Sequence, residues 1–192
     1  MEADWEVEVG GGAPTIEAHW PGYVDLRRSP EQAWHLPEAA RLPALAEALA
    51  KLNAAASPVW TSKCDFWSVV EPCEFDPDEL DAPPGCCAHA SGCYIDILPR
   101  GEGHWDLPAK AAAACKDVCG LLRAVPLRCC RVDLIIRGAA TDQNLADATG
   151  LDEFGVTAYL TACGLSPAEA AVTLDAALAA FAHVLGDQST LE

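Results

Sequence analysis

The segment from Leu127 to Arg137 alternates apolar and polar side chains with a period of two. Such alternation is typical of a β-strand that buries one face. The apolar positions are Cys130, Val132, Leu134 and Ile136, and the charged positions on the other side are Arg131, Asp133 and Arg137. The segment therefore predicts a strand in a sheet with one apolar face and one charged face.

The same alternation recurs along the chain, with helical patterns between the pairs of strands. Further strands are predicted over residues 4–9, 16–20, 59–70, 92–98 and 155–163. Helices are predicted to begin at Pro37 or Pro43, at Pro108 and at Pro167, because proline lacks the N–H that is unpaired at the first helical position anyway. Gly10–Gly12 is predicted to turn the chain between the first two strands. The order is ββα three times, with sub-units expected at 1–57, 58–126 and 127–188.

These elements predict an α+β fold, a two-layer sandwich in one domain over residues 1–190. We expect a mainly antiparallel sheet of about six strands, with three helices on one face. Strands two to five follow the order β-α-β-β-α-β, which is the ferredoxin-like core order. Leu191 and Glu192 are expected to be a vector-derived remnant outside the fold.

The charge balance excludes one class of partner. Twenty-nine acidic and twelve basic side chains give a formal net charge of −17. Such a surface repels phosphate backbones and attracts cations, so we expect no nucleic-acid binding and a cationic small molecule or a basic protein as partner.

The cysteine content and the hydropathy pattern bear on the compartment. The first thirty residues lack the charged and apolar regions of a signal peptide, and no stretch reaches the ~18 apolar residues of a membrane helix. Ten cysteines without a secretion signal favour a cytoplasmic protein with free thiols. We expect no membrane association and no cofactor.

The polar face of the predicted sheet is the candidate binding site. It combines aromatic rings with aspartates, which are poor strand formers and therefore need a reason to recur there. Rings offer flat contact and cation–π attraction, and carboxylates hold cationic groups. The predicted ligand is an amine-bearing molecule, with Arg131 orienting Asp133. The proposed ligand-binding residues are Asp65, Trp67, Tyr94, Asp96, Arg131, Asp133 and Tyr159.

Two alternative roles are compatible with the same face. Its charges could form a cross-strand ladder of ion pairs, or the face could be a protein-interaction or homodimer interface. Shape separates these roles: a concave face with a pocket of ~300–1,000 Å³ favours a small ligand. A flat face covered by a symmetric copy favours a dimer.

A second alternative involves the cysteines. Cys73, Cys86, Cys87 and His89 are weak metal-ligand candidates, because zinc sites usually contain Cys-x₂₋₄-Cys pairs and this chain has no Cys-x-x-Cys. A cysteine-dependent enzyme is the other version of this alternative. No catalytic motif appears in the sequence, so an enzyme is not favoured and no catalytic residue is assigned.

Overall fold

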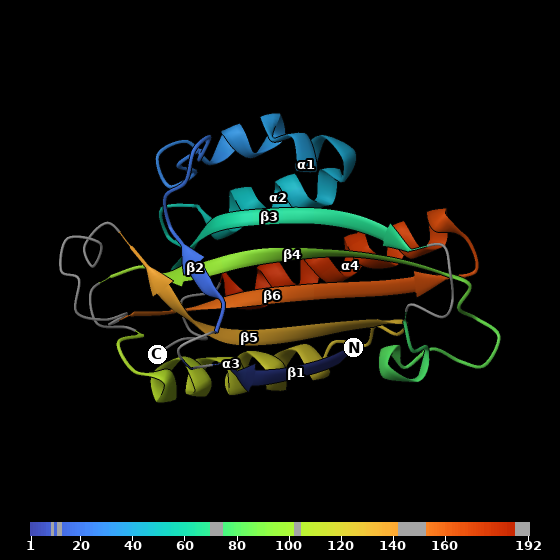
Figure 1. The fold of residues 1–192 in the computed structure, drawn as a ribbon. Helices are drawn as coiled ribbons and strands as arrows, with labels where there is room; N and C mark the ends of the chain where they lie inside the picture. The colour runs from blue at the N-terminus through green and yellow to red at the C-terminus, as the bar shows by residue number, and fades with distance from the viewer. Residues whose placement is uncertain (9, 11–12, 70–74, 102–104, 142–152, 187–192) are drawn as a thin grey trace.

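The computed structural model describes residues 1–8, 10, 13–69, 75–101, 105–141 and 153–186. In this part of the chain, six strands combine with four α-helices and two short 3₁₀ helices (Figure 1). In chain order they are β1 (Glu2–Val7), β2 (Thr15–Glu17), η1 (Pro30–His35), α1 (Pro37–Arg41), α2 (Pro43–Leu52), β3 (Val59–Val69), η3 (Asp78–Leu80), β4 (His89–Pro99), α3 (Pro108–Arg123), β5 (Cys130–Ala140), β6 (Glu153–Gly164) and α4 (Pro167–Leu185).

Each of these α-helices begins at a proline, which confirms the predicted helix starts. The start of α4 is reinforced by reciprocal capping. The Ser166 hydroxyl accepts a hydrogen bond from the Glu169 N–H at 3.2 Å, and the Glu169 carboxylate accepts one from the Leu165 N–H at 2.8 Å. These bonds satisfy backbone donors that have no partner inside the helix.

The sheet is mixed and mostly antiparallel, with the order β1-β5-β6-β4-β3. The pairs β3–β4, β4–β6 and β5–β6 are antiparallel, and β1 is parallel to β5. The units β3-β4-α3 and β5-β6-α4 therefore meet through their second strands, which lie side by side in opposite directions (Figure 1).

The ferredoxin-like order is not confirmed, because β6 lies between β5 and β4. The first unit has the predicted order of two strands followed by helices, but its two strands do not pair with each other. Instead of forming a hairpin, β1 and β2 both run parallel to β5 and pair with successive parts of it. Both strands therefore run in the same direction along β5. Gly11 and Gly12 of the predicted turn lie outside the described residues.

The main core lies between the sheet and helices α2, α3 and α4. The alternate apolar positions of β4, β5 and β6 are buried, as alternation predicts, and Leu122, Leu174 and Leu178 of the helices pack against them. In β4 and β6 these positions are Cys93, Ile95, Ile97, Val156, Ala158 and Leu160. Cys64 and Phe66 of β3 are partly buried against the same cluster. These contacts confirm the predicted apolar face of each of these strands.

The opposite face of the sheet is covered by the chain itself at one end. There β5 curls forward and carries β2 across the front of the sheet (Figure 1). Ile16 is 2 % exposed and packs with Trp60, Leu98 and Ala139. A Cβ on Gly155 would lie 2.7 Å from the Ile16 side chain, so glycine leaves the space that Ile16 fills. We call this cluster the β2 cover. It places Ile16 on the face away from the helices.

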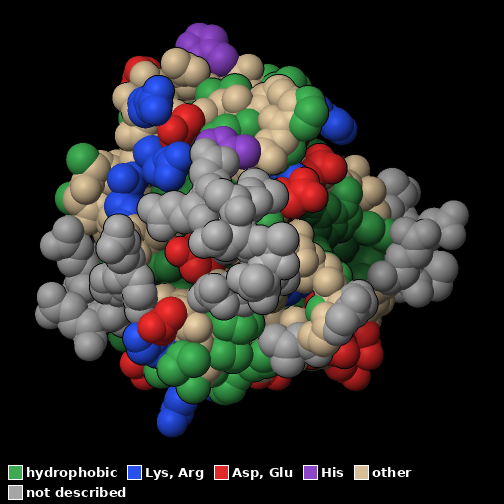
Figure 2. Space-filling view, turned by 60° about the vertical axis from the view of Figure 1, so that its left-hand side comes forward, with side chains coloured by type: hydrophobic (Ala, Val, Ile, Leu, Met, Phe, Trp, Pro, Cys, Tyr) green, Lys and Arg blue, Asp and Glu red, His purple; other side chains and the backbone are tan. Residues whose placement is uncertain are grey.

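Basic side chains gather at the upper left of Figure 2, and one basic side chain packs on the β2 cover. The Arg27 guanidinium lies 4.0 Å from the centroid of the Trp60 ring. Arg100 donates to the carbonyls of Val59 and Asn53, and burial together with the nearby Arg27 lowers its pKa. This end of the polar face is therefore filled by the protein's own aromatic and cationic groups.

The other end of the polar face is covered by the segment before β4. Leu80 and Ala82 pack there against Ala90 of β4 and Cys163 of β6. The ion pair of Asp81 with Arg128, at 3.0 Å, holds the same segment. We call this cluster the η3 cover. Between the two covers, the described residues leave the middle of the polar face open.

Helix α4 is long and apolar enough to cross a membrane, judged by length and composition alone. Its residues Leu174, Leu178 and Phe181 are nevertheless completely buried against the sheet. Core helices of soluble proteins share this composition, so the helix is weak evidence for a membrane span.

Candidate functional site

Four of the predicted ligand-binding residues lie in one row across the sheet. Asp133 of β5 pairs with Tyr159 of β6, Tyr159 with Tyr94 of β4, and Tyr94 with Asp65 of β3. Asp4 of β1 extends the row, because it pairs with Asp133. Neighbouring strands are ~4.8 Å apart, so Asp133 and Asp65 lie about 14 Å from each other across the sheet. The two tyrosines lie between them.

The units β3-β4-α3 and β5-β6-α4 contribute to the row in the same way. Each unit contributes an aspartate from its first strand and a tyrosine from its second, and the two tyrosines meet where β4 and β6 pair. Their ring centroids lie 6.0 Å apart, and Trp67 lies 6.4 Å from Tyr159. The three rings form a continuous aromatic floor.

A hydrogen-bonded chain runs beside this floor. Arg137 of β5 donates to Glu8 at 2.9 Å and to the hydroxyl of Thr157 at 3.1 Å. Thr157 in turn donates to the carboxylate of Asp96 at 2.6 Å. Both Thr157 and Asp96 are buried, and burial raises the pKa of Asp96 against the opposing effects of Thr157, Lys63 and Arg137. This chain fixes the strands that carry the tyrosines.

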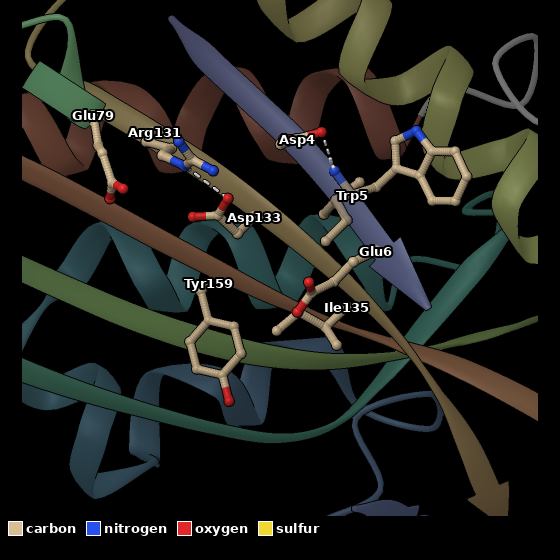
Figure 3. Close-up of a pocket in the computed structure, with 9 residues that line it drawn as sticks. Asp4, Trp5, Glu6, Glu79, Arg131, Asp133, Ile135 and Tyr159 are labelled. Carbon is tan, nitrogen blue, oxygen red and sulfur yellow. Dashed lines mark hydrogen bonds and ion pairs between the residues drawn. The ribbon is translucent and has the colours of Figure 1, made fainter. Parts of the chain in front are cut away.

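A cavity of about 440 Å³ opens over β1, β5 and β6 beside Tyr159. Glu79 enters from η3, Glu6 from β1, and Arg131 and Asp133 from β5, so that their polar groups surround one space (Figure 3). Asp4 also lines the cavity, although Arg123 approaches its carboxylate at 3.7 Å. The lining thus holds four carboxyl groups and one guanidinium among the residues that the structure describes.

The charge in this cavity is only partly neutralised. Arg131 Nε lies 2.7 Å from the Asp133 carboxylate, a distance at which Arg131 can hold this carboxylate in one orientation. Within the described residues, neither Glu6 nor Glu79 forms an ion pair, and both are exposed. Burial raises the pKa of Asp133, Arg131 opposes that rise, and the carboxylates of Asp4 and Glu79 add to it. The cavity therefore has an excess of negative charge.

Of the seven predicted ligand-binding residues, three line the cavity and four do not. Arg131, Asp133 and Tyr159 line the cavity. Trp67 and Tyr94 touch it only through the ring of Tyr159. Asp65 is exposed at the far end of the row, and Asp96 is buried in the hydrogen-bonded chain.

The sequence does not identify Asp4, Glu6 and Glu79 as part of the site. Alternation in β1 indicates the outward direction of Asp4 and Glu6, but it does not indicate that β1 pairs with β5. Glu79 lies in an acidic loop whose position depends on the packing of its neighbour Leu80. No local signal places it beside Arg131.

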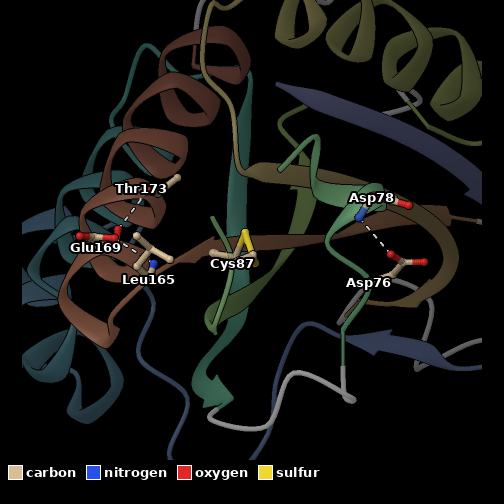
Figure 4. Close-up of a disulfide and its surroundings, with 7 residues drawn as sticks. Asp76, Asp78, Cys87, Leu165, Glu169 and Thr173 are labelled. Atoms are coloured by element: carbon tan, nitrogen blue, oxygen red, sulfur yellow. Dashed lines mark hydrogen bonds between the residues drawn. A yellow bond between two sulfur atoms is a disulfide. The ribbon is translucent and has the colours of Figure 1, made fainter. Parts of the chain in front are cut away.

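The cysteine loop is arranged differently from the expected set of free thiols. Cys87 and Cys163 form a disulfide (Figure 4), so the expectation of free thiols is wrong for this pair. Cys73 lies outside the described residues. Among the residues that are described, no three His, Cys, Asp or Glu side chains form a group that could hold a metal ion. The weak metal-site alternative that includes Cys73 is therefore not tested.

Comparisons with known proteins bring no relative: no family model matches the sequence, and no curated protein or solved structure is significantly similar to it.

Proposed function

We propose that this protein binds a cationic, amine-bearing small molecule in the cavity formed by β1, β5, β6 and η3. The observation that carries the proposal is the excess of carboxyl groups, Glu6 and Glu79 above all, around a space of about 440 Å³ beside the Tyr159 ring. Ammonium groups would bind the carboxylates, and the alkyl part of the ligand would lie along the aromatic floor.

The shape of the polar face supports a small ligand over a symmetric interface. The β2 cover and the η3 cover occupy its two ends with the chain's own side chains. In the described part of the chain, what remains open includes a recess of about 440 Å³, within the ~300–1,000 Å³ of small-molecule pockets. A second copy of the chain would need a flatter and larger surface to bury a stable interface.

Linear diamines and polyamines of increasing length are suitable probes. A thermal-shift screen followed by calorimetry should find stabilisation by these amines, and none by diols or dicarboxylates of equal length. A ligand at a hundred times its Kd should add ~2.7 kcal/mol to the free energy of unfolding. The stabilisation should fall in 0.5 M salt, because exposed charges are screened.

The variant Glu79→Gln removes one cavity charge with little effect on the fold, because the Glu79 side chain is exposed and forms no ion pair with another described residue. Affinity for a diamine should fall about threefold to tenfold, which corresponds to ~0.7–1.4 kcal/mol. Glu31→Gln is the matched control, since Glu31 is also exposed but lies in η1, away from the cavity. If the two variants bind a diamine equally well, or if no amine stabilises the wild type, the cavity is not the binding site.

A further inference from the structure

Cys163 lies between two other cysteines at the end of the sheet. On one side it is bonded to Cys87, with the two Cα atoms 5.5 Å apart. On the other side its N–H donates to the carbonyl of Cys129 at 2.8 Å, directly beyond the ladder pair Cys130–Ala162. Cys129, the residue directly before β5, therefore lies beside Cys163.

We propose that Cys163 is the centre of a thiol–disulfide exchange site, in which it bonds either to Cys87 or to Cys129. The backbone hydrogen bond and the shared cluster bring Cys129 and Cys163 together, and a disulfide requires Cα atoms within ~4.4–6.8 Å of each other. We therefore expect the second bond to form without displacement of β5 or β6. All three side chains belong to the cluster of the η3 cover, where Cys163 is 1 % exposed and the other two pack against it.

The backbone of Cys129 provides an independent observation. Its φ of 61° lies in the left-handed region, which residues other than glycine, asparagine and aspartate seldom adopt. Strained backbone of this kind occurs at functional sites, where the surrounding structure holds it in place. The Cys129 thiol is partly exposed, and a surface groove of about 520 Å³ is lined by Cys86, Cys129 and Cys163, so solvent reaches the site.

The exchange is balanced without an oxidant or a reductant. The Cys129 thiolate attacks Sγ of Cys163, so that the Cys129–Cys163 bond forms and the Cys87–Cys163 bond breaks. The electron pair of the broken bond leaves with Cys87, which takes up a proton from water. One disulfide and one thiol are present before and after the step.

The environment of Cys129 sets the pH dependence of the exchange. Burial raises the pKa of Cys129, the neighbouring Cys86 thiol and Asp81 add to the rise, and the Arg128 guanidinium opposes it. The thiolate is therefore a minor species at neutral pH, and the rate should increase as the solution becomes more alkaline. The exchange also removes the covalent link between β6 and the segment that carries Glu79, which is then held by the Asp81–Arg128 ion pair and by the packing of Leu80 and Ala82.

Disulfide mapping of the whole protein tests this site. The wild type is incubated at pH 7, 8 and 9 with a trace of glutathione, acidified, alkylated with N-ethylmaleimide, digested and analysed by mass spectrometry. We expect peptides linked through Cys87–Cys163 and through Cys129–Cys163, with the second form appearing faster as pH rises. Finding Cys87–Cys163 alone at every pH, or finding every cysteine alkylated, overturns the proposal.

The variant Cys87→Ser gives a second measurement. Equilibrated in a buffer of reduced and oxidised glutathione, it should form the Cys129–Cys163 bond, and Cys87→Ser with Cys129→Ser should leave Cys163 glutathionylated or free. Cys86→Ser is the matched control and should keep both linked peptides. A folded Cys87→Ser protein, judged by circular dichroism, whose Cys163 stays unpaired contradicts the proposal; if this variant does not fold, the wild-type mapping decides.

Discussion

The indole ring of Trp67 lies directly on the backbone of Gly92, its partner in the neighbouring strand: a Cβ added at position 92 would come 2.6 Å from the ring. Only glycine allows the ring to lie flat at this point of the aromatic floor. The ring's contact with Tyr159 depends on that placement.

We expect Gly92→Ala to displace Trp67 and to lower the free energy of unfolding by ~1–3 kcal/mol, the usual effect of overpacking. Gly120→Ala is the matched control, because no described atom lies within 4 Å of the added Cβ in α3 and alanine favours a helix by ~1 kcal/mol. Urea unfolding followed by tryptophan fluorescence measures both. The prediction fails if the two substitutions change stability in the same direction.

Leu134 tests the apolar face of β5. It is 2 % exposed within the main core, so Leu134→Ala should cost ~2–5 kcal/mol. Leu121→Ala on α3 removes a side chain that is 47 % exposed and should cost less than ~1 kcal/mol. Chemical denaturation provides the comparison, and a loss under ~1 kcal/mol for Leu134→Ala would contradict the position of this side chain in the core.

Asp96 should make stability depend on pH. Because burial raises its pKa in the folded state above the ordinary value of 3.8, the protonated form is favoured by folding. Its contribution is fully present below that value and is lost as pH rises through the folded pKa. We expect Asp96→Asn to be more stable relative to the wild type at pH 7 than at pH 3.5, measured by urea midpoints. Asp117→Asn, at an exposed position, should show no such difference; a greater relative loss at pH 7 would mean that ion pairing dominates at Asp96.

Arg131 should limit how tightly the cavity holds a cation. Arg131→Gln removes the one guanidinium among the described residues of its lining, so at pH 8 a diamine should bind about fivefold more tightly, for ~1 kcal/mol of lost repulsion. Arg28→Gln removes a charge that is 87 % exposed, on a segment outside the cavity lining, and should leave affinity unchanged. Calorimetry at low and high salt measures both. Weaker binding by Arg131→Gln would show that Arg131 serves mainly to hold Asp133 in place.

The row of Asp65, Tyr94, Tyr159 and Asp133 shows what the sequence can predict. Alternation places each of these residues on the polar face, because a shift by one position would bury a charge in the core. Proline and the helical spacing also determine where the helices begin. Both signals are local, and the structure confirms both.

The position of Ile16 shows where local signals end. Alternation predicts that its side chain is buried, and it is, but on the other face of the sheet from the helices. The reason is the curl of β5, which depends on long-range packing of β2 over Leu98 and Gly155. For the same reason the sequence does not predict the strand order, and with it the acidic wall beside Arg131.

The pairing of β1 with β5 has a consequence for folding kinetics. The β3–β4 and β5–β6 pairs join strands that follow one another in the chain, whereas β1 must meet β5 across most of the sequence, with Glu2 beside Arg131. Contacts between distant segments form slowly, because closing a long loop costs entropy before any contact compensates for it. We therefore expect β1 to add to the sheet late, after the transition state. Glu6 would then reach the cavity only after the transition state, so the binding site would be complete only in the folded state. A bound amine should therefore slow unfolding far more than it speeds folding.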